Sequence, residues 1–419
     1  MYPRHSETLL KELLKEFRIL YLTGPRQAGK TTLARQIAND LGMYYVSLDE
    51  QTYLASAQSD PHGFIHSFTG KPIVLDEFQQ APELIMAIKL VSDQLQPSER
   101  GRFFLTGSSD IFKTTKTQEA LPGHMATIEL YPLSVTEITG SHFNLINFLL
   151  SDNLSIPENF PTLNREQLAQ TLINGGYPEL QSKSPRARQI WFSSYIQGRL
   201  LKDFENIYNA KADYHTKLKT LIPYLAGLTG NLLKYANIAN DLAQNDKVIK
   251  SYIEVLEWMF IVKRIYPFVK NSAKRQMIGM PKLQMIDTGL ACHLLGLKKP
   301  QQLLTSTFFG GLLESFIVME CFKHMAWADE TMNIYHFRDV KKNEVDIVLE
   351  QADGNLIGIE VKASSTVRAS DFKGLKKFAQ LVGDRLKYGL IFYTGARLLP
   401  FSNGDKPYYA IPLSVLWSG

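Results

Sequence analysis

Residues 17–41, FRILYLTGPRQAGKTTLARQIANDL, contain the pattern that decides the fold. A short apolar run, typical of a buried strand, comes first, and a helical pattern follows. Between them lies a segment that fits GxxxxGK[ST], in the strand–loop–helix context which that motif requires. It consists of Gly24, Pro25, Arg26, Gln27, Ala28, Gly29, Lys30 and Thr31.

This loop has the composition of a phosphate cradle. Glycines let backbone N–H groups curl around phosphates, and the start of the helix adds positive potential. We expect Lys30 to reach the terminal phosphates and the Thr31 hydroxyl to bind magnesium. Thr32 follows directly and is included among the expected nucleotide-binding residues. The pattern therefore predicts ATP and Mg²⁺ as ligands.

Two further strand ends carry polar residues. The apolar run at residues 73–75 ends in Asp76 and Glu77, and the run at residues 103–105 ends in TGSS. Because parallel strands present their carboxyl ends at one edge, these residues should meet the loop there. Asp76 is expected to hold magnesium, Glu77 to polarise the attacking water, and Ser108, with Thr106 and Ser109 nearby, to contact the γ-phosphate.

Strand-like and helical segments alternate from Phe17 to about Glu137, which predicts an α/β domain with a parallel sheet over residues 1–140. An Asn-, Ser- and Pro-rich stretch predicts a linker or insertion over residues 141–166. Residues 167–300 have mainly helical periodicity. Within them, NLLKYANIANDLA, a QND turn, KVIKSYIEVLEWMF and the strand-like IVKRIYPF outline a winged helix-turn-helix.

Residues 301–419 read as a separate α/β domain in the order helix, three strands, helix, strand. Asp346 and the run Glu360-Val361-Lys362 fall on adjacent predicted strands, resembling the PD-(D/E)xK nuclease pattern. The two carboxylates are expected to share a second divalent ion with the Val361 carbonyl, and Glu314 to complete the shell. Lys362 would orient or deprotonate a water. The alternative is a salt-bridged strand pair without cleavage.

Basic charge is concentrated beside the predicted winged helix. Between Ile261 and Pro300 one acid, Asp287, stands against eight basic residues: Lys263, Arg264, Lys270, Lys274, Arg275, Lys282, Lys298 and Lys299. With Lys247, Lys250 and Tyr252 on the second helix, this pattern favours contacts with DNA phosphates over base reading. A protein-contact module or a solvated face is the alternative.

The composition excludes several classes of protein. The chain has 419 residues, 45% hydrophobic and 21% charged, and a formal charge of +5, which suits a globular chain with local polyanion sites. Its two cysteines, Cys292 and Cys321, do not form a CxxC pair, so we expect a reducing, cytoplasmic location. No run has the length of a signal peptide or a membrane span.

These motifs together resemble a prokaryotic AAA-type family of the AAA+ superfamily, with a P-loop ATPase domain, a winged helix and a PD-(D/E)xK nuclease-like C-terminal domain of unassigned function. The resemblance covers nearly the whole chain through ten blocks in order: GPRQAGKTTL, IVLDEFQ, FFLTGSS, LPGHMATIELYPLS, GGYPEL, KLQMIDTGL, LLESFIVMECF, YHFRD, EVDIVLE and IEVKAS. One departure is Gly123-His124, where the family often has a glycine–arginine pair.

The resemblance implies a homo-oligomer in which a neighbouring subunit supplies an arginine, for which Arg100, Arg102 and Arg199 are candidates. The leading hypothesis is an ATP-hydrolysing machine that acts on DNA and carries a possible metal-dependent nuclease domain. The first alternative is a nucleotide-controlled switch whose nuclease-like domain binds without cutting. The second is a nucleotide kinase or small-molecule phosphotransferase, for which the sequence offers neither a lid nor an acceptor site.

Overall fold

The computed structural model describes residues 2–96, 98–108, 123, 125–151, 154, 161–208, 214–269, 279–401 and 406–418. They form two compact units, which are described separately. The first contains residues 1–133 with 258–260, and the second contains residues 134–257 with 261–419. The division into four segments that the sequence suggested stays a prediction.

The first unit is built on a five-stranded sheet in the order β2-β3-β4-β1-β5, in which every pairing is parallel. Its strands are β1 (Ile19–Thr23), β2 (Tyr44–Ser47), β3 (Ile73–Asp76), β4 (Phe103–Gly107) and β5 (Met125–Glu129). The helices are α1 (Ser6–Glu16), α2 (Lys30–Leu41), α3 (Gln51–Ser59), α4 (Pro61–His66) and α5 (Leu84–Gln94). The predicted parallel α/β sheet is therefore confirmed.

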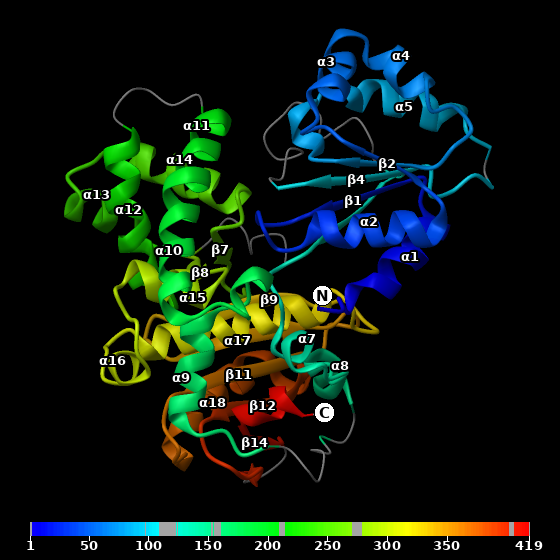
Figure 1. Ribbon diagram of the computed structural model, residues 1–419. Helices are drawn as coiled ribbons and strands as arrows, with labels where there is room; N and C mark the ends of the chain where they lie inside the picture. The colour runs from blue at the N-terminus through cyan, green and yellow to red at the C-terminus, as the bar shows by residue number, and fades with distance from the viewer. Residues whose placement is uncertain are drawn as a thin grey trace. The chain divides into compact units, whose positions relative to one another are not determined.

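Helices cover both faces of this sheet, with α1 and α2 on one side and α3, α4 and α5 on the other (Figure 1). Alternate residues of β1 enter different cores, because successive strand side chains point to opposite faces. Ile19 and Tyr21 join the core under α3–α5, whereas Leu20 and Leu22 join the core under α1 and α2. The apolar run of β1 is continuous because both faces are buried.

The second unit contains a helical part. Its helices are α7 (Val135–Thr139), α8 (Leu145–Leu150), α9 (Arg165–Asn174), α10 (Pro185–Tyr195), α11 (Leu201–Tyr208), α12 (Tyr214–Leu228), α13 (Tyr235–Asp241), α14 (Asp246–Trp258), α15 (Thr288–Leu294) and α16 (Pro300–Leu304). Strands β6 (Asn231–Leu232), β7 (Val262–Ile265) and β8 (Lys282–Met285) form an antiparallel sheet in the order β6-β8-β7. The predicted helix, turn, helix and strand are present as α13, α14 and β7.

Part of the predicted linker is packed structure. Helix α8 buries its apolar side chains, and His324 accepts a hydrogen bond at Nδ1 from the Leu145 amide (3.0 Å). The Asn144 side chain caps α8 and also donates to the His324 carbonyl (3.1 Å). The polar residues that follow this helix favour a linker or insertion, whereas the apolar LINFLL run before them forms the helix.

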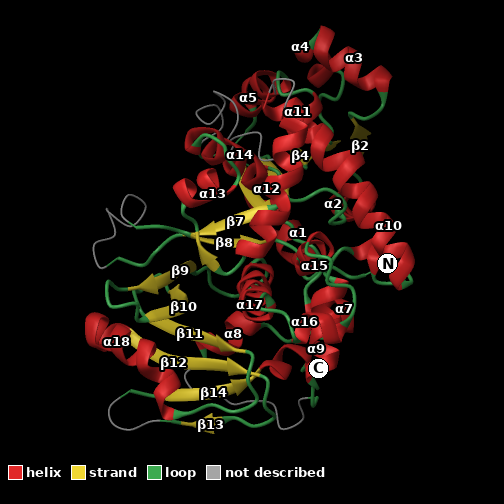
Figure 2. Ribbon diagram, turned by 90° about the vertical axis from the view of Figure 1, so that its left-hand side faces the viewer, coloured by secondary structure: helices red, strands yellow, loops and turns green. Residues whose placement is uncertain are grey.

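The same unit contains a six-stranded mixed sheet in the order β13-β14-β12-β11-β10-β9 (Figure 2). Helix α17 (Phe309–Met325) precedes β9 (Asn333–Arg338), β10 (Glu344–Glu350) and β11 (Leu356–Lys362), and α18 (Lys373–Val382) precedes β12 (Leu386–Tyr393). This confirms the predicted order of elements. Strands β13 (Leu399–Pro400) and β14 (Tyr408–Pro412) extend the sheet, and α18 packs its Leu375 and Phe378 into the sheet's core.

Candidate active site

The carboxyl ends of three neighbouring strands define the candidate site in the first unit. Strand β4 lies between β1 and β3, and the register pairs Thr23 of β1 with Gly107 of β4. The loop that follows β1, the acids that end β3 and the hydroxyl residues that end β4 therefore share one edge of the sheet. This is the edge at which parallel α/β sheets bind their ligands.

The loop between β1 and α2 has a tightly determined shape. Gly24 has φ 147°, and a Cβ at this position would lie 2.1 Å from the Leu130 carbonyl oxygen, so only glycine fits. Gly29, with φ 100°, caps the start of α2. From outside the loop, the Arg4 guanidinium donates to the carbonyl oxygens of Ala28 (2.6 Å) and Tyr131 (2.7 Å). Arg4 thus fastens the loop to the segment that follows β5, a contact that sequence reasoning missed.

Lys30 lies inside this loop and is 5% exposed. Its Nζ donates to the carbonyl oxygens of Gly24 (2.9 Å) and Pro25 (2.8 Å). Burial lowers the pKa of Lys30 to about 8, the nearby Glu77 carboxylate opposes this, and Arg26 adds to it. The ammonium group is thus poorly compensated by its surroundings, and a triphosphate would supply the missing negative charge.

Asp76 is buried at the end of β3 and accepts three hydroxyl hydrogen bonds. Thr31 Oγ1 donates to Oδ1 over 3.3 Å, Thr106 donates to the same oxygen, and Tyr45 donates to Oδ2. Hydroxyl and carboxylate oxygens are the ligands that Mg²⁺ prefers, so Thr31 and Asp76 fit the metal ion that the loop implies. Bound there with ATP, the ion would neutralise charge on the phosphate oxygens.

Glu77 follows Asp76 with φ 55°, in the left-handed region that a non-glycine residue rarely adopts. The backbone leaves strand β3 at this turn. The Glu77 amide donates to Thr106 Oγ1 (3.4 Å). The Gln79 side chain donates to the Glu77 carboxylate and to Ser108 Oγ (3.0 Å), and it accepts from the Ser108 amide (3.3 Å). Gln79 therefore joins the two strand ends.

Gln79 and Tyr45 are candidate functional residues that sequence reasoning missed. The signal for Gln79 was present in the order Asp76-Glu77-Phe78-Gln79, because a side chain two residues beyond the acid can turn back toward it. Tyr45 gave no comparable signal, since it sits within the apolar-looking strand β2. Of the remaining loop residues, Gln27 and Thr32 are exposed, and Arg26 is half-buried.

Of the candidate arginines, Arg102 does not suit a role in a neighbouring subunit. It is 7% exposed and donates to the Phe68 carbonyl oxygen (2.5 Å), because it directly precedes the buried strand β4. Arg100 and Arg199 are exposed, and Arg199 lies in a π-helical turn, Ile196–Leu200, between α10 and α11. Gly123 is exposed, whereas Ser109 and His124 lie outside the described residues.

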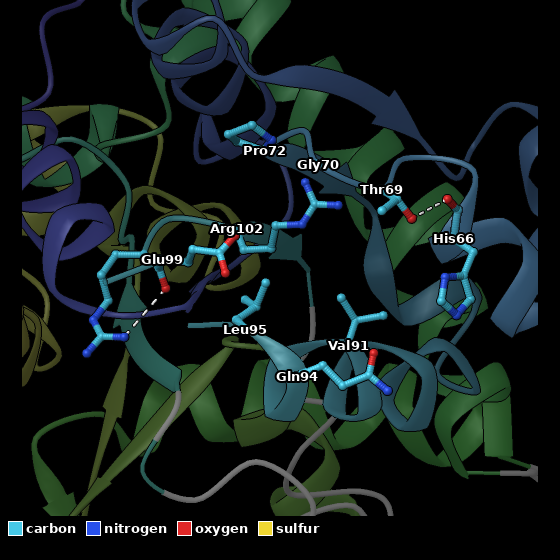
Figure 3. A pocket seen from close by; sticks show the side chains of 10 residues that line it. His66, Thr69, Gly70, Pro72, Val91, Gln94, Leu95, Glu99 and Arg102 are labelled. Atoms are coloured by element: carbon cyan, nitrogen blue, oxygen red, sulfur yellow. Dashed lines mark hydrogen bonds between the residues drawn. The ribbon is translucent and has the colours of Figure 1, made fainter. Parts of the chain in front are cut away.

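A cavity of about 320 Å³ opens at the opposite edge of the same sheet (Figure 3). Pro72 and Arg102, which line it, directly precede β3 and β4 and so mark the amino ends of these strands. The other lining residues belong to α4, α5 and the segments that follow these two helices, and they include His66, Val91 and Leu95. This cavity is therefore separate from the phosphate loop.

In the second unit, the predicted metal site has a different occupant. The Nζ of Lys282 lies 3.0 and 3.1 Å from the two Glu314 carboxylate oxygens and 3.0 Å from Asp346 Oδ1. Glu344 Oε1 is 2.8 Å away. Burial alone would lower the pKa of Lys282, but the three carboxylates together raise it. The sequence groups Lys282 with the DNA-facing basic residues, and that prediction is wrong because its side chain is buried among acids.

Glu360 and Lys362 lie beside this cluster and pair with each other, with Nζ 3.3 Å from Oε2. A Cβ at Gly374 would approach Glu360 Oε1 to 2.6 Å, so that oxygen points to the start of α18. Burial raises the pKa of Glu360 to about 7, although Lys362 opposes this. Among the residues that the structure describes, no group of three His, Cys, Asp or Glu side chains is placed to hold a metal ion. The expected Asp346–Glu360–Glu314 metal shell is therefore not formed in this structure.

Other basic residues of the predicted DNA-binding segment also have partners. The Arg264 guanidinium binds the Glu257 carboxylate (2.5 Å), and the Lys263 ammonium lies 4.3 Å from the centre of the Phe322 ring. Tyr252 is buried against Phe204 and Tyr208, so it does not face a groove. Exposed basic residues remain at Lys247, Lys250, Lys298 and Lys299. Lys270, Lys274 and Arg275 lie outside the described residues.

Comparisons with known proteins agree with the site in the first unit. Residues 16–139 match the family model described as "AAA domain". This match supports an AAA-type P-loop ATPase domain, with ATP binding and hydrolysis as its chemistry. Residues 165–301 and 309–416 match two models that are each described as a domain of unknown function, DUF8612 and DUF4143.

Two relatives are similar over most of their length. They are "Uncharacterized protein Mb2031c" of Mycobacterium bovis and "Uncharacterized protein Rv2008c" of Mycobacterium tuberculosis. Each is 25% identical over 400 residues, which cover 96% of this chain and 82% of the relative.

Solved structures are similar at a lower level. The Walker-type ATPase PABY2304 of Pyrococcus abyssi has a TM-score of 0.43 and 16% identity, covering 70% of this chain and 96% of that one. AMPPCP-bound DnaA from Aquifex aeolicus has a TM-score of 0.25 and 13% identity, covering 60% of this chain and 85% of that one.

In the part of the chain that is described, no helix is long and apolar enough to cross a membrane.

Proposed function

We propose that this chain hydrolyses ATP in the first unit and uses the cycle to act on DNA. One observation carries the proposal: the pairs Lys30–Thr31 and Asp76–Glu77 come from two segments of the chain and meet at one sheet edge. Lys30 would bind the β- and γ-phosphates with the loop amides, and Thr31 and Asp76 would hold Mg²⁺. Glu77 would accept a proton from the attacking water. Gln79 would hold the Glu77 carboxylate in place, and Ser108 would contact the γ-phosphate.

The nucleic-acid part of the proposal rests on the helical part of the second unit. The order α12-β6-α13-α14-β7-β8, with sheet order β6-β8-β7, supports our proposal that this part is a winged helix-turn-helix. Lys247 and Lys250 are exposed on α14, which would be the recognition helix. Since few residues there could read bases, we expect phosphate contacts and a strong dependence of affinity on salt.

An arginine from a second copy of the chain would complete the ATP site. Arg199 and Arg100 are the candidates that remain, because both are exposed. An arginine in this role stabilises charge on the transferring phosphoryl group. We therefore expect a homo-oligomer, and Arg199→Ala or Arg100→Ala should lower turnover without weakening ATP binding. The predicted cytoplasmic location agrees with Cys292 and Cys321, which are free and buried, and it stays a prediction.

A second candidate function is a nucleotide-controlled switch whose C-terminal domain binds without cleaving. The position of Lys282 among the acids favours this alternative over a nuclease. One experiment separates the two functions: ATP turnover measured with a panel of single-stranded, duplex and branched DNA and of RNA, with the same samples inspected for cleavage. Stimulation by DNA supports the motor. Slow turnover that DNA does not change, with a nucleotide-dependent change in mass, supports the switch.

A further inference from the structure

The second unit carries a buried cluster in which one ammonium group meets four carboxylate oxygens. Lys282, at the start of β8, supplies the ammonium, and its side chain is 2% exposed. Glu314 comes from α17, and Glu344 and Asp346 come from β10. All four N···O distances lie between 2.8 and 3.1 Å. Such an arrangement satisfies the donors of one lysine and leaves little space at its centre.

Neighbouring groups hold these carboxylates in place. Gln284, two residues beyond Lys282 on the same face of β8, donates to Glu314 Oε1 (3.1 Å). The Val361 amide donates to Asp346 Oδ2 (2.9 Å), and Arg338 donates to Glu344 Oε2 (3.0 Å). In both Glu344 and Asp346, one carboxylate oxygen therefore accepts a hydrogen bond from the six-stranded sheet. The other oxygen contacts Lys282. The cluster is built around the ammonium group.

A divalent ion at this place would need the same oxygens. Mg²⁺ binds oxygen at about 2.0–2.1 Å, so it would sit within a few ångströms of Nζ. Two positive centres at that distance in a buried site repel each other strongly. Glu360, the other acid of the nuclease-like pattern, is turned to Lys362 and Gly374. The residues present therefore do not fit a metal ion while Lys282 holds its position.

We infer that Lys282 is a built-in cation that takes the place of the metal ion and keeps this site free of divalent ions. The lysine belongs to the three-stranded sheet, whereas the acids belong to α17 and the six-stranded sheet. The ion pairs consequently fasten β8 to the C-terminal sheet. In this state the acids have a structural role, and the domain does not cleave phosphodiester bonds.

Binding of Mn²⁺ to the full chain without nucleotide tests this inference. Calorimetry on the wild type and on Asp346→Asn should give the same isotherm, because Asp346 binds no metal in either protein. A wild-type binding event that is lost in Asp346→Asn would overturn the inference. This comparison does not depend on ATP hydrolysis, so it is informative whether or not the proposed ATPase activity is found.

Removal of the lysine gives the complementary test. Lys282→Gln leaves the acids without their cation, so the variant should melt at a lower temperature and gain a Mn²⁺ site at least tenfold tighter than any in the wild type. Millimolar Mn²⁺ should then raise its melting temperature by several degrees, and adding Asp346→Asn should abolish this effect. Lys323→Gln is a matched control, because Lys323 pairs with the buried Glu320 (2.8 Å) away from this cluster. It should gain no Mn²⁺ site.

A folded Lys282→Gln protein that binds no Mn²⁺ would contradict the inference. If Lys282→Gln does not fold even with Mn²⁺, Lys282→Arg decides instead. It keeps the positive charge, and it should bind no more Mn²⁺ than the wild type. Metal binding by Lys282→Arg that depends on Asp346 would overturn the inference.

Discussion

Replacement of Lys30 by methionine should stabilise the nucleotide-free protein while destroying its ability to bind ATP. The pKa of Lys30 falls from 10.5 to about 8 because the side chain is buried. Each pKa unit corresponds to about 1.4 kcal/mol, so the buried ammonium costs about 3 kcal/mol at pH 7. Loss of the hydrogen bonds to Gly24 and Pro25 offsets this by about 1 kcal/mol each. The net gain for Lys30→Met is therefore about 1–2 kcal/mol.

The pH dependence of this gain has a definite sign. The folded-state pKa is lower than the unfolded one, so the unfolded chain binds more protons between about pH 8 and pH 10.5. Wild-type stability therefore rises with pH through this window, and the advantage of Lys30→Met should shrink by about 1 kcal/mol between pH 7 and pH 9. Hydrogen-exchange mass spectrometry on peptides from β1 and α2 measures the opening free energy. The exposed Lys15→Met serves as control.

A less stable Lys30→Met protein at pH 7, or an advantage that grows with pH, would refute the reasoning. Either result would mean that the loop carbonyls compensate the ammonium fully, and that the loop is not arranged to receive a negatively charged ligand.

Three further changes test other parts of the account. Glu77→Gln should bind ATP normally but hydrolyse it about 100- to 10,000-fold more slowly, since general-base catalysis contributes this much; unchanged turnover in a steady-state assay would remove Glu77 from its role. Gln79→Ala should lower kcat at least tenfold with little change in ATP affinity, because Gln79 orients Glu77 and Ser108, and a loss confined to affinity would contradict this. Exchange of Lys247, Lys250, Lys298 and Lys299 for alanine should weaken binding to all DNA sequences and lower the salt slope by up to about one for each phosphate that is no longer neutralised; Lys263→Ala, whose ammonium packs on Phe322, is the control and should change little.

The nucleotide site was predictable because its signals are local. The loop is a continuous motif, and Asp76-Glu77 and Thr106-Gly107-Ser108 each end an apolar strand. Parallel pairing then brings strand ends together without further information. Gln79 was harder to predict, because its contact with Ser108 depends on the left-handed turn at Glu77.

The Lys282 cluster could not be predicted from sequence, because it joins residues 282, 314, 344 and 346 across separate elements. Counting charges along the chain placed Lys282 with its basic neighbours, although β8 directs it into a core. The hydrophobic periodicity predicts the helices and strands of the C-terminal part. It does not predict which carboxylate oxygen Lys282 contacts, because tertiary packing decides that. Arg102 is a second example, because the sequence alone does not show that its side chain is buried.

Calorimetric titration of Mg²⁺ and a non-hydrolysable ATP analogue into the wild type and Lys30→Ala tests the central claim most directly. We expect one site per chain with measurable heat in the wild type and none in Lys30→Ala, with both proteins folded by circular dichroism. Absence of heat in the wild type, or equal binding by the two proteins, would contradict it.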